Sequence, residues 1–145
     1  MLPEGCFSLS SSFFAAPKTR AVTVAVFAAT LFATAPASAA TRQVSHAGAD
    51  SGDCTAAPCA SFAYAYGRAA SGDVIQVAAG TYGQQSTPNG SKTVTFRGGP
   101  GVVLRRMVND ASNVTFDGIN VDAGGVTPDG AGFELGGDNV VVKNA

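Results

Sequence analysis

Three segments with one shared pattern determine the expected fold: TVTFRG at residues 93–98, NVTFDG at 113–118 and NVVVKN at 139–144. In each segment Val or Phe occupies the second and fourth positions, which is the period of a β-strand, and in the last segment Val141 fills the third position as well. Each segment ends in Gly or Asn, the residues that best tolerate a positive φ angle. The ends are spaced by 20 and then 26 residues, a period typical of repeats that stack.

Parallel stacking of these segments places equivalent side chains over one another. Two inward columns are predicted: Val94, Val114 and Val140, and then Phe96, Phe116 and Val142. Arg97, Asp117 and Lys143 form an outward column whose charges alternate in sign. Neighbouring strands lie about 4.8 Å apart, so opposite charges on adjacent strands attract. We interpret this column as a surface ladder worth under about 1 kcal/mol per pair.

Further short strands are predicted between the shared segments. A strand over 74–77 opens the series, and apolar alternation follows the glycine corners at 102–104 and 119–121, with another strand at 133–135. Three strands per coil of about 22 residues predict a three-faced solenoid. The fold class is therefore all-β, a right-handed parallel β-helix over residues 73–145. A sandwich or antiparallel barrel is the alternative, but it needs tight hairpins, and these corners do not supply them.

The pattern of the first 39 residues indicates a targeting segment. Lys18 and Arg20 precede an uncharged run at 21–35, and small residues with an A-x-A site end at Ala39. This order is that of a secretory signal peptide. A transmembrane helix is the alternative, but it needs about 20 apolar residues. We predict a secreted, extracellular protein without a membrane segment after cleavage.

Residues 40–72 are predicted to form an N-terminal cap. Cys54 and Cys59 are the two cysteines after the signal segment, and in an exported protein such a pair indicates a disulfide. A zinc site would need further ligands, and His46 is the single histidine. Apolar residues at helical spacing over 62–69 predict a short helix, which would cover one end of the stack.

Composition limits the partners. Charged residues make up 13% of the 145 residues and the formal net charge is −1, so no basic surface for nucleic acid is expected.

The string GDVIQVAAGTY at 72–82, preceded by the C-x4-C pair and an alanine-rich helix, resembles the N-terminal part of secreted right-handed β-helix proteins with the pectate-lyase-like fold. NVTFDGINV at 113–121 resembles an interior coil of that family, with Gly118 where the family often has Asn. The resemblance covers roughly residues 43–145 and implies the fold. It leaves the activity open, since lyases, hydrolases, epimerases, adhesins and proteins of no known activity share this opening.

The resemblance also directs attention to calcium and to arginine, because pectate lyases of this fold use acidic residues to hold Ca²⁺ and an arginine as the base. The candidates for catalysis are Asp117, Asp122, Glu134, Arg105 and Arg106. Asp117 and Asp122 are the candidate Ca²⁺ ligands. A hydrolase would instead need two carboxylates about 5–9 Å apart, for which Asp117 with Asp122 or Asp122 with Glu134 are the pairs to test.

The structural alternative for each acidic residue is a solvated turn or strand position. This applies equally to the remaining acidic residues of the repeat region, Asp110, Asp129 and Asp138. Tyr64, Tyr66 and Tyr82 are candidates for stacking on sugars, although Tyr66 falls on the expected packed face of the helix.

Three functions remain open. The first is a lyase-like or glycosidase-like enzyme acting on acidic polysaccharide, and the second is a non-catalytic solenoid that binds a glycan or a surface partner. The third is a scaffold without independent activity, because the sequence stops at 142–145 in what is expected to be the middle of a coil and is expected to be truncated. An uncapped last coil would expose strand edges and invite self-association.

Overall fold

The computed structural model describes residues 38–124 and 132–145. Nearly all of the predicted signal segment, and Asp129, lie outside these ranges. The helix is α1 (Phe62–Arg68), and the strands are β1 (Thr41–Val44), β2 (Val74–Val77), β3 (Gly80–Gly90), β4 (Val94–Arg97), β5 (Val102–Ala111), β6 (Val114–Asp117), β7 (Asn120–Val121), β8 (Phe133–Leu135) and β9 (Val141–Lys143). Within the described ranges, no helix has the length and apolar character that crossing a bilayer requires.

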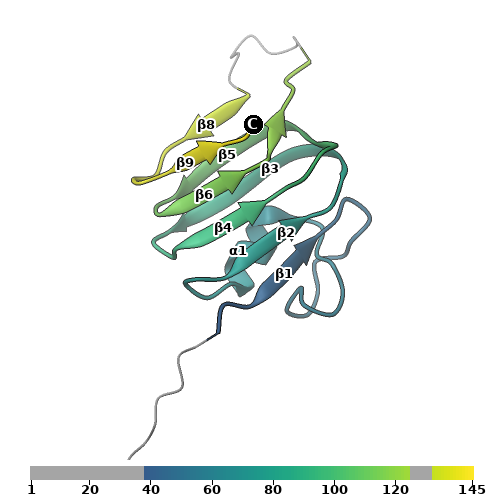
Figure 1. The fold of residues 1–145 in the computed structure, drawn as a ribbon, viewed down its shortest axis with the longest axis vertical. Helices are drawn as coiled ribbons and strands as arrows, with labels where there is room; N and C mark the ends of the chain where they lie inside the picture. The colour runs from purple at the N-terminus through teal and green to yellow at the C-terminus, as the bar shows by residue number, and fades with distance from the viewer. Residues whose placement is uncertain (1–37, 125–131) are drawn as a thin grey trace, which may run out of the picture. The chain divides into compact units, whose positions relative to one another are not determined.

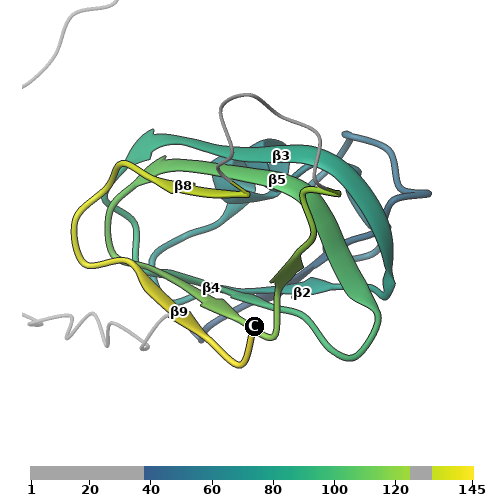
Figure 2. The same cartoon turned by 90° about the horizontal axis from the view of Figure 1, so that it is seen from above.

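The strands form two parallel sheets (Figure 1). Sheet A has the order β1-β2-β4-β6-β9, and sheet B has the order β3-β5-β7, with β8 also paired to β5. Seen from above, the two sheets lie on opposite sides of the interior (Figure 2). The all-β class with one short helix is therefore confirmed.

The separate third face expected from the sequence is wrong for the described residues, which form two sheets. The reason is the length of β5, which continues without interruption from Val102 to Ala111. Its first half pairs with β7 and its second half pairs with β8. Two strands that the sequence assigns to different faces therefore belong to one sheet.

The predicted stacking of the shared segments is confirmed by the register of sheet A. Val94 pairs with Val114 and Phe96 with Phe116 in parallel strands. The rings of Phe96 and Phe116 are stacked with centroids 5.3 Å apart, and Phe62 of α1 stacks on the other side of Phe96 at 4.8 Å. All three rings are fully buried, so a continuous stack of three aromatic rings runs through the interior.

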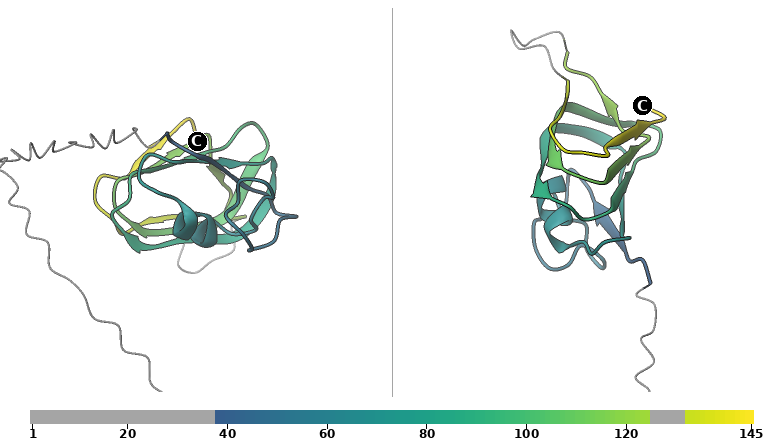
Figure 3. Two further views of the ribbon diagram at one scale, coloured as in Figure 1. Left: turned by 90° about the horizontal axis from the view of Figure 1, so that it is seen from below. Right: turned by 90° about the vertical axis from the view of Figure 1, so that its left-hand side faces the viewer.

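The end of the fold at β1 is covered by the disulfide loop and by α1 (Figure 3). Cys54 and Cys59 form the predicted disulfide. The amide of Gln43 donates to the Cys54 carbonyl at 2.6 Å and that of Ser45 to the Cys59 carbonyl at 2.9 Å. The loop thereby supplies hydrogen-bond partners to the outer edge of β1, which would otherwise be an open sheet edge.

The helix forms as predicted, with its boundaries set by local contacts. Ser61 is the N-cap, and its hydroxyl accepts from the Tyr64 amide at 3.2 Å, the usual way to satisfy a free N–H in the first turn. The buried residues Phe62, Ala65 and Tyr66 face the core. The helix ends at Arg68, with Ala69 as its C-cap.

Asp73 ties the N-terminal segment to the first coil. Its buried carboxylate accepts hydrogen bonds from the Ala40 and Ala70 amides, each at 2.9 Å, and pairs with the Arg42 guanidinium at 3.0 Å. Burial alone raises the pKa of Asp73, but the bonds from Ala70, Ala40 and Arg42 outweigh it and leave the pKa below its usual value. Asp73 is therefore a structural anion.

Candidate functional site

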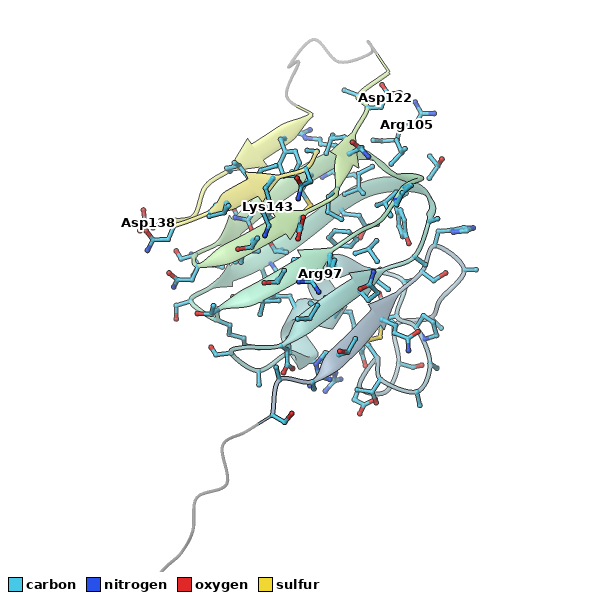
Figure 4. The ribbon with its side chains drawn as sticks, viewed as in Figure 1. Arg97, Arg105, Asp122, Asp138 and Lys143 are labelled. Carbon is cyan, nitrogen blue, oxygen red and sulfur yellow. A yellow bond between two sulfur atoms is a disulfide. The ribbon has the colours of Figure 1, made fainter. Side chains whose placement is uncertain are left out.

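The most regular polar surface is the outer face of sheet A. The register places five side chains in one column across the strands, one on each: Gln43, Gln76, Arg97, Asp117 and Lys143. We name this set the polar column. Residues alternate between the two faces of a strand, and Phe96 and Phe116 are buried on the inner face, so the column lies on the outside. Arg97 and Lys143 are labelled in Figure 4.

Asp117 lies between two cations. Its Oδ2 atom is 3.8 Å from Nε of Arg97 and 3.4 Å from Nζ of Lys143. The arginine and lysine side chains are 53% and 51% exposed, whereas Asp117 is only 18% exposed. The predicted ladder is confirmed, and its two cations point toward solvent.

Asn144 completes the surroundings of Asp117. Its Nδ2 group donates to Oδ1 of Asp117 at 2.7 Å. This hydrogen bond is the main cause of a lowered Asp117 pKa, and Lys143 and Arg97 lower it further against a smaller opposing effect of burial. Asp117 is thus a carboxylate at neutral pH, and it is poorly suited to donate a proton.

A hollow of about 320 Å³ lies beside Asp117 and is lined by backbone corners and short polar side chains. Its lining residues are Gly98, Gly99, Pro100, Asp117, Gly118, Asn120 and Asn144. A Cβ on Gly98 would collide with the carbonyl oxygen of Gly118, and Gly118 itself has φ +68°. The two corners therefore stack closely because they carry no side chains.

The other sequence candidates lie elsewhere. Arg106 and Glu134 form an ion pair of 2.7 Å between β5 and β8 in sheet B. Asp122 follows β7, and its Oδ1 accepts from the Gly124 amide at 2.9 Å, as a turn aspartate does. Arg105 is exposed on β5, and Figure 4 draws it near Asp122.

The acidic candidates therefore contact separate partners and do not line one common hollow. Neither Asp122 nor Glu134 lines the hollow that contains Asp117. Across residues 38–124 and 132–145, no three His, Cys, Asp or Glu side chains are grouped as metal ligands would be. The oxygens of Asp117, a candidate Ca²⁺ ligand, already face Asn144, Arg97 and Lys143.

Two of the three tyrosines proposed to stack on sugars are buried and cannot contact a sugar ring. Tyr66 and Tyr82 are each 2% exposed. The Tyr82 hydroxyl donates to the Ala78 carbonyl at 2.7 Å, and burial raises its pKa. Tyr64 is partly exposed, but the Arg68 guanidinium lies over its ring at 4.8 Å.

Sequence reasoning missed Asn120 and Asn144 as site residues and treated Arg97 and Lys143 as a structural ladder only. The alignment of the three segments contained part of the signal, since it placed the two cations in one column. The hollow had no sequence signal, because it depends on how closely two glycine corners approach.

No family model, curated protein or solved structure matches this chain.

Proposed function

We propose that this chain is a secreted right-handed parallel β-helix that binds acidic polysaccharide on the outer face of sheet A without cleaving it. The observation that carries the proposal is the polar column together with the hollow beside Asp117. The signal-like segment at 1–39 and the Cys54–Cys59 disulfide support an extracellular location, because disulfides persist in oxidising compartments.

The parallel ladders support the β-helix. Strands 20 or more residues apart pair in register, as β2 does with β4 and β4 with β6. From β2 onward, the chain visits sheet B between successive strands of sheet A. Connections between parallel strands of one sheet are right-handed in about 98% of cases, which supports the proposed hand.

The residue types around the hollow support a glycan as the ligand. Arg97 and Lys143 offer exposed cations for carboxylate or sulfate groups, and a guanidinium matches a carboxylate with two parallel hydrogen bonds. Asn120 and Asn144 line the hollow and offer amides that both donate and accept, which suits sugar hydroxyls.

Binding fits this arrangement better than hydrolysis does. Retaining and inverting glycosidases each use a pair of carboxyl groups, one of which needs a raised pKa to act as the acid. Among the residues that the structure describes, Asp117 is the single carboxylate that lines the hollow, and its pKa is lowered.

The test measures binding and turnover on the same samples. Calorimetric titration of the full chain with acidic polysaccharides should give binding that weakens as salt rises, because the contacts are exposed charges. Incubation with or without Ca²⁺ should give no unsaturated or reducing products. Product formation that depends on Asp117 or Arg106 would replace this proposal with an enzymatic one.

Substitutions locate the binding face. The double variant Arg97→Gln and Lys143→Gln should lose most of the binding, since it removes both exposed cations of the polar column. Arg105→Gln is the matched control, because it removes one exposed cation from sheet B and should leave binding unchanged. Equal losses of binding in the double variant and in Arg105→Gln would place the glycan elsewhere.

A further inference from the structure

We infer that the bound polysaccharide carries its anionic groups on alternate sugars, with an uncharged, hydrogen-bonding sugar between them. This inference rests on the proposed function and specifies its ligand. It follows from the order of charges in the polar column, which is cation, anion, cation on three successive strands.

The spacing of the column sets the spacing of the ligand's charges. Arg97, Asp117 and Lys143 lie on β4, β6 and β9, which are adjacent in sheet A. Adjacent strands are about 4.8 Å apart, so the two cations are separated by two strand spacings. One spacing is comparable with the length of one sugar in an extended chain. A chain that follows the column therefore places every second sugar at a cation.

Asp117 determines what the middle sugar can carry. It remains ionised at neutral pH and accepts hydrogen bonds without donating any. A carboxylate on the middle sugar would meet this like charge, whereas a hydroxyl or an amide N–H would donate to it. The column thus selects against a polymer with an acid group on every sugar. Asp117 repels an acid group on the middle sugar, while Arg97 and Lys143 attract the acid groups on the sugars on either side.

The hollow provides space for that middle sugar. Asp117 lines it together with Gly98 and Gly118, and Asn120 and Asn144 are also among its lining residues. Its volume of about 320 Å³ is at the lower end of the range for small-ligand pockets. The uncharged sugar therefore meets polar amides and glycine backbone, while its charged neighbours extend to Arg97 and Lys143.

The experiment compares two polymers on the full chain. Hyaluronan carries one carboxylate per two sugars, and polygalacturonate carries one on every sugar. Titrations with chain-length-matched oligomers at low salt should show hyaluronan binding about fivefold more tightly per site, the effect of one like-charge contact near 4 Å in water. The preference should shrink as salt rises.

The variant Asp117→Asn removes the middle charge and keeps a hydrogen-bonding amide of the same size. We expect it to bind polygalacturonate more tightly and to lose the preference for hyaluronan. Asp122→Asn is the matched control, because it removes an exposed carboxylate outside the hollow and should leave the preference intact. Circular dichroism of each variant verifies the fold, and the wild-type comparison stands without either variant.

The outcomes separate the two proposals. If wild-type protein binds neither polymer, the proposed function fails. If it binds both polymers equally, or polygalacturonate more tightly, the alternation inference is overturned while glycan binding stands. A hyaluronan preference that survives in Asp117→Asn also overturns it, since the selection would then arise elsewhere.

Discussion

The two ends of sheet A use the same strand pattern and differ in what covers them. At the first end, Val44 of β1 is 1% exposed, because the disulfide loop and α1 pack over it. At the other end, Val142 of β9 is 37% exposed, and among the described residues no strand pairs with its outer edge. Burial in this fold therefore depends on a neighbour on each side of a strand, and the strand's own residues are not sufficient.

The same lesson applies along the inward column of Phe96, Phe116 and Val142. The pattern predicts all three as equivalent core positions. Phe96 and Phe116 are fully buried between flanking layers, whereas Val142 has a packed neighbour on one side only. The alternation correctly predicts the direction of each side chain. The position of its strand in the stack determines how much of the side chain's area is buried.

The largest expected effect tests this difference in burial along the inward column. Phe96→Ala should lower the free energy of unfolding by about 3–5 kcal/mol, since it leaves a cavity between two stacked rings. Val142→Ala, in the same column, should cost under about 1 kcal/mol. Urea denaturation of the full chain measures both, and equal losses would contradict the comparison.

Removal of the disulfide should open the first end selectively. Changing Cys54 and Cys59 to Ser should cost about 2 kcal/mol, the low end expected for a short loop. Hydrogen exchange should accelerate at the amides of Gln43 and Ser45, which donate to the loop carbonyls. The Gly98 amide donates to the backbone carbonyl of Asp117 at 2.8 Å. It serves as the control and should retain its protection.

The Asp73 network should make the same end sensitive to acid. Its folded-state pKa is lower than the usual value of 3.8, so the ionised form stabilises the native state above that pH. The contribution is lost as pH falls through the lowered pKa. Asp73→Asn should cost about 1.5 kcal/mol at neutral pH, and the difference from wild type should shrink below pH 4.

Urea titrations of the wild type and of Asp73→Asn at several pH values measure how the difference in their free energies of unfolding shrinks in acid. A difference that stays constant into strong acid would mean that the Asp73 charge contributes nothing to folding.

The smallest effect is expected near the exposed end. Arg97→Gln with Lys143→Gln removes two exposed cations, and such surface pairs contribute little to stability. The unfolding midpoint should stay within error of the wild-type value, even though the proposed glycan binding is expected to be lost. A large fall in the midpoint would instead assign the polar column a structural role.

Much of the fold follows from short patterns in the sequence. The strands of sheet A after β1, the short helix over 62–69 and the disulfide were all predicted from alternation, helical spacing and cysteine count. These features depend on residues close together in the chain. The strand β1 and the full length of β3 were missed, because TRQV at 41–44 and GTYGQQSTPNG at 80–90 lack clear apolar alternation.

The interior also contains polar residues that no pattern predicted. Thr87 and Asn109 are fully buried on β3 and β5, and the threonine hydroxyl donates to the asparagine side-chain oxygen. Asn109 in turn donates to the Ala111 carbonyl at 2.8 Å. The sequence around each residue does not indicate burial, because the partner that satisfies its polar side chain lies 22 residues away.

By itself the sequence determined which side chains of the shared segments point inward, where the chain turns, and that opposite charges follow one another in a column. Only the tertiary structure decided that there are two sheets, that Asp117 is isolated from Asp122 and Glu134, and that two glycine corners leave a hollow beside it. The physical reason is the range of the interactions. Alternation and turn preference act within a few residues, whereas register and the approach of distant corners depend on how separate coils pack.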